Sequence, residues 1–239
     1  MTAHHPLQRL ASPSRQLSML LHLAGIASFA ASFKFLQGWE TPMSAAFGGH
    51  FQFLTIIGLA LALSTFAVGF LADATLSSRL FKLKNVLSVG SAPLEVLISI
   101  LYWGLCAIDK NLVVPPDMQL GFLPDFGFHA APAIFLAVDL LLLSPPWTIH
   151  GYSALALSET LAFLYWSWVE YCHSRNGWYP YPIFDILNTW QRALLFTFSA
   201  SLMTGSTMLL KWTYGKINGI EEFKKEAVAN PAGIRAKGE

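Results

Sequence analysis

The chain has 239 residues, of which 54% are hydrophobic and only 12% are charged, and its formal net charge is +1. Soluble domains carry about 25% charged residues, so this composition excludes a protein whose whole surface is exposed to water. We find no glycine-rich phosphate loop and no basic patch with interleaved aromatic residues, so nothing in the sequence supports nucleotide or nucleic-acid binding.

Long apolar segments make up most of the sequence. They cover residues 17–37, 52–73, 86–108, 126–143, 151–171 and 191–213. Each reaches or approaches the roughly 20 residues that a helix needs to cross a bilayer, and none alternates as the strands of a membrane barrel do. We therefore predict an all-α polytopic membrane protein with six transmembrane helices in one domain, residues 17–214.

The positive charges are segregated along the chain. Four cationic residues fall in or beside the first, third and fifth connections: Lys34, Lys110, Arg175 and Arg192. The other eleven precede the first segment, lie between the second and third, or end or follow the sixth: Arg9, Arg15, Arg79, Lys82, Lys84, Lys211, Lys216, Lys224, Lys225, Arg235 and Lys237. Because cationic loops stay in the cytoplasm, we expect cytoplasmic termini: residues 1–16, and a polar, disordered tail over 215–239.

The N-terminus has a second interpretation. Arg9 and Arg15 followed by an apolar run with small residues also fit a signal peptide. The run continues through Phe33, Phe35 and Leu36, which favours a retained first span. Cleavage would leave five spans and would not change the orientation of the others.

Two polar side chains lie just inside two of the predicted spans. With both termini cytoplasmic, the segments that contain Thr55 and His129 both begin on the outer side, and each residue lies about one turn in. At a rise of about 1.5 Å per residue, both are roughly 5 Å below the same membrane face. A Thr hydroxyl beside a neutral His could carry out acyl transfer, the Thr as nucleophile and the His as base.

Structural roles compete with this hypothesis. A Thr in a membrane helix usually donates to its own i−4 carbonyl or joins two helices. A lone His such as His129 is often a packing or pore residue, and His22 in the first segment is a rival candidate for the base. The pairing of Thr55 with His129 therefore needs support from elsewhere.

One acidic residue lies on each side of His129: Asp125 just before the fourth segment, and Asp139 within it. Asp139 is ten residues later, about 15 Å along a helix and roughly 80° around it, so it cannot orient the imidazole directly. A buried structural hydrogen bond is the favoured role for Asp139. Asp125, one turn before His129, is better placed to support it.

Metal chemistry fits the histidine pattern poorly. The seven histidines are residues 4, 5, 22, 50, 129, 150 and 173, without His-x-x-His or His-Glu-x-x-His spacing. We expect no metal and no other cofactor. Cys106 and Cys172 could form one bridge, although two free thiols are the favoured interpretation.

Four sequence stretches carry a family resemblance. They are GGHFQFLT (48–55), AIDKNLVVPP (107–116), FLPDFGFHAA (122–131) and NGWYPYPIFD (176–185). In order and spacing they resemble the androgen-induced-gene family of membrane hydrolases, which includes the androgen-dependent regulator of tissue-factor-pathway inhibitor. The similarity runs from about residue 17 to 214.

The resemblance implies an intramembrane threonine hydrolase that cleaves fatty acid esters of hydroxy fatty acids. The family nucleophile falls on Thr55, the family His on His129, and an acidic residue ten positions later on Asp139. Animal members show Asn-His-Gly-x-His-Thr around the His, where this chain has Asp125-Phe-Gly-Phe-His129-Ala. The missing first His and following Thr indicate a distant branch, of the kind that a fungal member would represent.

Two functional classes remain open on the sequence. One is a lipid-ester hydrolase whose substrate enters from the bilayer, and the other is a lipid or solute transporter or a membrane scaffold. In the second class, His129, Asp139 and Glu159 would form a polar path. Endomembrane (endoplasmic reticulum) and plasma-membrane locations both fit, and neither the oligomeric state nor the natural substrate follows from the sequence.

Overall fold

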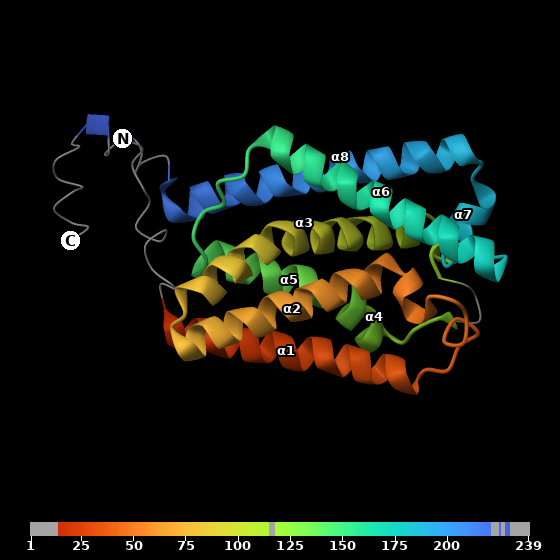
Figure 1. Cartoon of the computed structure of the whole chain (residues 1–239), viewed down its shortest axis with the longest axis horizontal. Helices are drawn as coiled ribbons and strands as arrows, with labels where there is room; N and C mark the ends of the chain where they lie inside the picture. The colour runs from red at the N-terminus through yellow and green to blue at the C-terminus, as the bar shows by residue number, and fades with distance from the viewer. Residues whose placement is uncertain (1–13, 115–117, 221–224, 226–227, 230–239) are drawn as a thin grey trace.

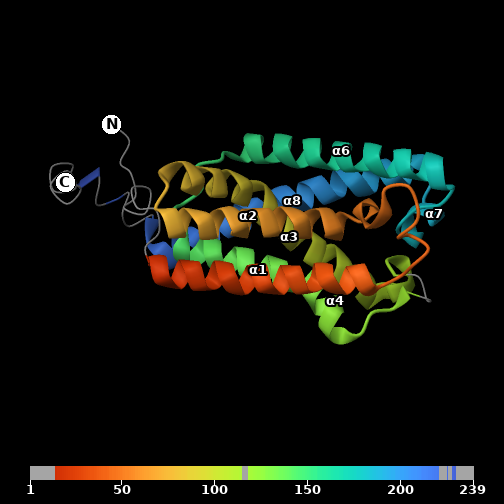
Figure 2. The same cartoon turned by 60° about the horizontal axis from the view of Figure 1, so that its bottom comes forward.

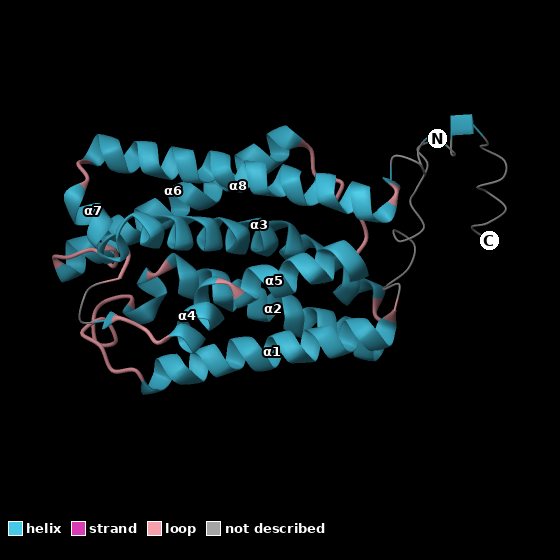
Figure 3. Cartoon of the chain, turned by 180° about the vertical axis from the view of Figure 1, so that it is seen from behind, coloured by secondary structure: helices cyan, strands magenta, loops and turns pink. Residues whose placement is uncertain are grey.

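The computed structural model describes residues 14–114 and 118–220, together with Lys225, Val228 and Ala229. Throughout these residues the regular structure is helical, and no strand occurs among them (Figure 3). The all-α class is therefore confirmed.

Each of the six predicted apolar segments is helical, five of them as single long helices. These five are α1 (Arg15–Gly38), α2 (Leu54–Thr75), α3 (Ser78–Asp109), α6 (Gly151–Asn176) and α8 (Thr189–Asn218). The fourth segment is broken into α4 (Phe122–His129), α5 (Ala131–Val138) and a π-helical turn, η5 (Asp139–Leu143). Shorter elements lie in the connections: η2 (Gly49–Gln52), η3 (Lys110–Leu112) and α7 (Pro182–Ile186).

The long helices pack side by side with alternating direction (Figure 1). α2 packs between α1 and α3, α3 also packs on α8, and α8 carries α6 on its other side. Figure 2 shows α1 and α6 on opposite sides of the bundle. α2 begins at the end where α4 and α7 lie, and α1 begins and α8 ends at the opposite end (Figure 1).

Among the described residues, four helices are long and apolar enough to cross a membrane: α1, α2, α3 with its η3 extension, and α8. α4 with α5 and η5 would add a fifth, with a bend of 44° between the two parts. α6 has 26 residues, but Ser, Glu and aromatic residues dilute its aliphatic content and it is not among these candidates. The chain is thus a multi-helix protein with four or five candidate spans, and a sixth span and the cytoplasmic termini remain predictions.

Helix boundaries modify two expectations. α2 begins at Leu54, so Thr55 lies in its first turn and not one turn inside it. α8 continues through Asn218, past the predicted domain end at residue 214. Residues 1–13 and most of the predicted tail lie outside the described residues.

Candidate active site

Thr55 lies where the chain enters α2, and tyrosine hydroxyls occupy the start of that helix. Its side chain is buried. The backbone N–H of the preceding residue, Leu54, donates to the hydroxyls of Tyr165 and Tyr181, each at 3.1 Å. Tyr165 in turn donates to the carbonyl of Gln52 at 2.9 Å. These bonds partner a helix N-terminal N–H that would otherwise be unsatisfied, and they fix Thr55 relative to α6 and α7.

Tyr181 lies close to Thr55. Its hydroxyl accepts a hydrogen bond from the Leu54 N–H, and the side chain and backbone of Thr55 are close enough to influence the pKa of its phenol. Burial raises the pKa of the Tyr181 phenol, so this group stays a neutral hydroxyl at neutral pH. A neutral hydroxyl beside Thr55 can donate a hydrogen bond to an oxygen atom that develops negative charge there.

His129 is the last residue of α4 and is also buried. Its Nδ1 lies 2.9 Å from Oδ1 of Asp125, one turn earlier, and 3.1 Å from the Asp125 carbonyl oxygen. A proton on Nδ1 that is donated to this carboxylate leaves Nε2 as the nitrogen that can accept a proton. The residue that the sequence placed one turn before His129 thus contacts its imidazole.

Tyr102 of α3 contacts both Asp125 and His129. Its ring stacks on the imidazole, with centroids 3.4 Å apart and planes 3° from parallel. Its hydroxyl donates to Asp125 Oδ1 at 2.5 Å. Lys110 Nζ lies 3.9 Å from the other carboxylate oxygen, and the Ser99 hydroxyl donates to the His129 carbonyl. The imidazole is therefore held by a carboxylate and by a stacked ring.

A small cavity brings Thr55 and His129 together. Its volume is about 70 Å³, and both residues line it along with Tyr102 and Tyr181. His50 from η2 lines the same cavity, where its Nε2 is 3.1 Å from the Ser44 hydroxyl, and burial lowers its pKa. His50 is a second histidine near Thr55 that we did not single out from the sequence.

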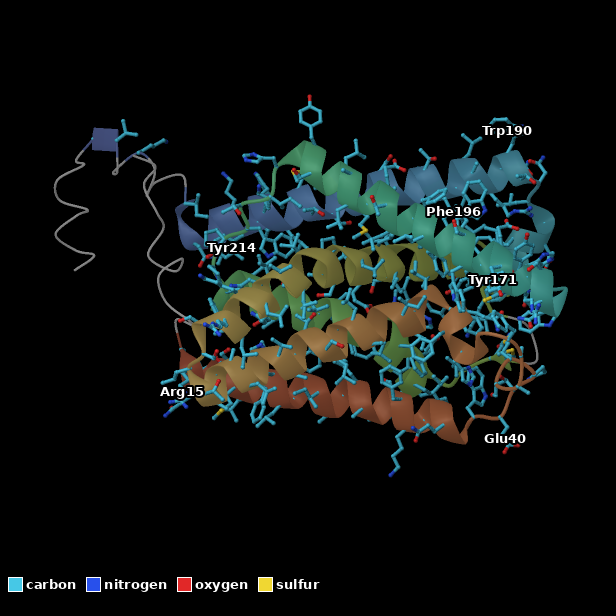
Figure 4. The ribbon with its side chains drawn as sticks, in the orientation of Figure 1. Arg15, Glu40, Tyr171, Trp190, Phe196 and Tyr214 are labelled. Carbon is cyan, nitrogen blue, oxygen red and sulfur yellow. The ribbon has the colours of Figure 1, made fainter. Side chains whose placement is uncertain are left out.

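A larger cavity begins at the same threonine. It encloses about 290 Å³ between α2 and α3 on one side and α6 and α8 on the other, and almost all of its lining is apolar. Phe196, labelled in Figure 4, is one of its lining residues on α8. Thr55, Tyr102, Val113 and Tyr181 line both cavities. Thr55 therefore stands between an apolar cavity and a smaller one that contains the histidine.

Asp139 belongs to a different site. Its carboxylate lies 2.5 Å from Lys84 Nζ and 3.2 Å from His22 Nε2, and it accepts a hydrogen bond from Ser144. His22 Nδ1 contacts Asp73 at 2.9 Å. This four-helix ionic cluster, defined as His22, Asp73, Lys84 and Asp139, is fully buried near the end where α1 begins and α8 ends. The structure thus brings neither Asp139 nor His22 to Thr55.

Sequence reasoning missed the tyrosines. Tyr102, Tyr165 and Tyr181 come from three distant parts of the chain, and no spacing rule connects them with Thr55. The one available signal is the aromatic composition of the fifth connection, which contains Tyr181. Both cysteines are free, and no cluster of three or more metal-ligating side chains occurs in the part of the chain that is described.

Comparison with known proteins gives one family and two curated relatives. Residues 17–215 match the model of the FAR-17a/AIG1-like protein family. A UPF0641 membrane protein of Schizosaccharomyces pombe is 32% identical over 208 residues, which cover 85% of this chain and 92% of the relative. The human androgen-induced gene 1 protein is 23% identical over 202 residues, covering 77% of this chain and 84% of the relative. No solved structure matches.

Proposed function

Because the chain belongs to the FAR-17a/AIG1-like family of membrane proteins, we propose that it is an intramembrane hydrolase of lipid esters, with Thr55 as nucleophile and His129 as base. Fatty acid esters of hydroxy fatty acids are the proposed substrate class, following the family resemblance. No cofactor enters this chemistry.

One observation carries the proposal: the two side chains line one cavity, and His129 is held there by Asp125 through Nδ1. A nucleophile, a base and a group that orients the base are the three parts that activate a weak hydroxyl nucleophile. An isolated packing histidine would not need a buried carboxylate on one nitrogen while the ring faces a cavity.

The reaction would proceed in two steps. In the first, Thr55 Oγ1 bonds to the ester carbonyl carbon while His129 Nε2 takes the hydroxyl proton, and that proton then passes to the departing alkoxide. The products are an acyl-threonine and a free alcohol. In the second step His129 takes a proton from water, whose oxygen attacks the acyl carbon. The bond from that carbon to Thr55 Oγ1 then breaks, the proton passes from His129 to Oγ1, and the fatty acid is released. Tyr181 is placed to stabilise the carbonyl oxygen in both steps.

The rival function is a lipid or solute transporter or a scaffold. It would use the apolar cavity to hold a lipid without turnover. The polar path expected for a transporter would join His129 to Asp139, but Asp139 pairs with His22 and Lys84 in the separate ionic cluster, which is why we place this function second.

Hydrolysis by purified protein tests the proposal. The substrate is an ester of a fatty acid with a hydroxy fatty acid, and the proteins are wild type, Thr55→Ala, His129→Ala and Thr75→Ala. Thr75 is an exposed residue at the far end of the same helix, where its hydroxyl donates to the Leu71 carbonyl. We expect wild-type turnover in Thr75→Ala and a loss of about 10²-fold or more in the other two, the usual contribution of an acid–base group.

The contrary outcomes are distinct. Equal turnover in all four proteins would reject the assigned residues. Binding of a labelled lipid ester without turnover in folded wild-type protein would favour the transporter or scaffold.

A further inference from the structure

The apolar cavity beside Thr55 contains an unusual polar group at its far end. Ser158 of α6 lines this cavity and is 1% exposed, and its hydroxyl has no hydrogen-bond partner. The other serine of the lining, Ser199, donates to the Leu195 carbonyl at 2.8 Å, as hydroxyls in apolar helices usually do. Because a buried unpaired hydroxyl is costly, the difference between the two serines suggests a ligand group at Ser158.

The helix register gives an approximate separation of this hydroxyl from the Thr55 end of the cavity. On α6, the side chain of Tyr165 reaches the start of α2, where its hydroxyl binds the Leu54 N–H. Ser158 lies seven residues earlier on the same helix, which is about 10 Å along its axis. An extended hydrocarbon advances about 1.25 Å per carbon, given C–C bonds of about 1.5 Å. The separation therefore corresponds to roughly eight carbons.

The two cavities differ in which half of an ester they can receive. The alcohol leaves with a proton from His129, so the leaving oxygen must lie on the side of Thr55 that faces His129 and the small cavity. The apolar cavity on the other side of Thr55 is then left for the acyl half.

We propose that the apolar cavity binds the acyl chain of the scissile ester and that Ser158 selects acyl chains with a hydroxyl or oxo group near their middle. The hydrogen-bonding oxygen would sit about eight carbons from the carbonyl, where the Ser158 hydroxyl has no partner within the protein. Ser158 is thus a specificity-determining residue, and the inference rests on the proposed function for the position of the carbonyl at Thr55.

The test compares esters of one alcohol with two long-chain acids, one plain and one with a mid-chain hydroxyl. Wild type should show a kcat/KM about fivefold to tenfold higher for the hydroxylated acyl group, the effect of one net hydrogen bond. Ser158→Ala should lose this preference. Ser167→Ala should keep it, because Ser167 is an exposed residue of the same helix whose hydroxyl donates to the Phe163 carbonyl. Equal rates for the two esters in wild type, or a preference that survives in Ser158→Ala, would overturn the proposal.

Binding of the free acids separates this inference from the proposed function. Wild-type affinity should peak when the hydroxyl is about eight carbons from the carboxylate and should fall as it is moved in either direction. That peak, absent in Ser158→Ala, would support the role of Ser158 even if no ester were cleaved. A lack of ester turnover would count only against the proposed hydrolase function. Affinity that is independent of hydroxyl position would overturn the inference whether or not esters are cleaved.

Discussion

The imidazole of His129 is restrained by contacts with three other residues. Asp125 engages its Nδ1, Tyr102 stacks on its face and also bonds to Asp125, and Ser99 holds its carbonyl. A restrained base reduces the reorganisation needed when the proton moves.

Substitution of Asp125 should separate orientation from charge. In Asp125→Ala the Nδ1 proton loses its carboxylate acceptor and keeps only the backbone carbonyl of residue 125, and we expect kcat to fall about tenfold or more with a smaller change in KM. Asp125→Asn keeps an oxygen that can accept this proton and should retain more activity than the alanine variant. Steady-state kinetics of the two variants checks this, and equal kcat in Asp125→Ala and wild type would show that the pair has no part in catalysis.

The sequence predicted the two central residues of this site but not their environment. Thr55 and His129 stand out because each is a polar residue at the start of an apolar run. Tyr102 and Tyr181 are ordinary members of aromatic-rich segments, and only the packing of α3 and α7 against α2 and α4 brings their hydroxyls to the site. Their roles depend on contacts between distant segments, which a single sequence does not reveal.

At the scale of elements, the ionic cluster connects α1, α2, α3 and η5. With both carboxylates ionised and Lys84 protonated, a proton on His22 would make the cluster neutral, which is the condition for burying so many charges. The helices are close here: a Cβ at Gly69 would lie 2.5 Å from His22 Nε2. The cluster therefore serves to fix the packing of these helices, away from the candidate active site.

Replacement of Lys84 tests whether the ionic cluster stabilises the helix packing. Lys84→Met leaves the buried Asp139 carboxylate without its lysine partner and should destabilise the protein by about 3 kcal/mol or more. Lys82→Met, an exposed neighbour on the same helix, should change stability by less than about 0.5 kcal/mol. Adding Asp139→Asn to Lys84→Met should restore part of the loss.

Thermal unfolding in detergent measures these effects. Equal midpoints for Lys84→Met and Lys82→Met would contradict a stabilising role for the cluster.

The helices themselves were largely predictable, because long apolar runs leave few alternatives. The break in the fourth segment was not. It falls at Ala130, ahead of Pro132, and the segment ends in a π-helical turn that begins at Asp139. Apolar residues flank both points, so hydropathy does not mark them. Pro132 has no backbone N–H and so favours a break before it, but proline is also common in the first turn of a helix and does not by itself predict the bend.

At the scale of the whole molecule, the alternating helix directions predict which connections share a membrane side. If α6 crosses the bilayer, Glu40 and Trp190 lie on one side and Arg79, in the first turn of α3, lies on the other. Glu40 and Trp190 are at the same end of the bundle (Figure 4). Single cysteines at these three positions, after replacement of Cys106 and Cys172 by Ser, should show this pattern with an impermeant thiol reagent on sealed membranes. Labelling of positions 40 and 190 from opposite sides would contradict six crossings.

The site and the fold together make one central claim, that Thr55 carries the acyl group between the ester and water. The most direct measurement is mass spectrometry of protein that is acid-quenched shortly after addition of a fatty acid ester, with peptides mapped across residues 48–60. We predict an acyl adduct on Thr55 in wild type, a longer-lived adduct in variants that slow water attack, and none in Thr55→Ala. Turnover with no adduct on Thr55, and equal turnover in Thr55→Ala, would contradict the account.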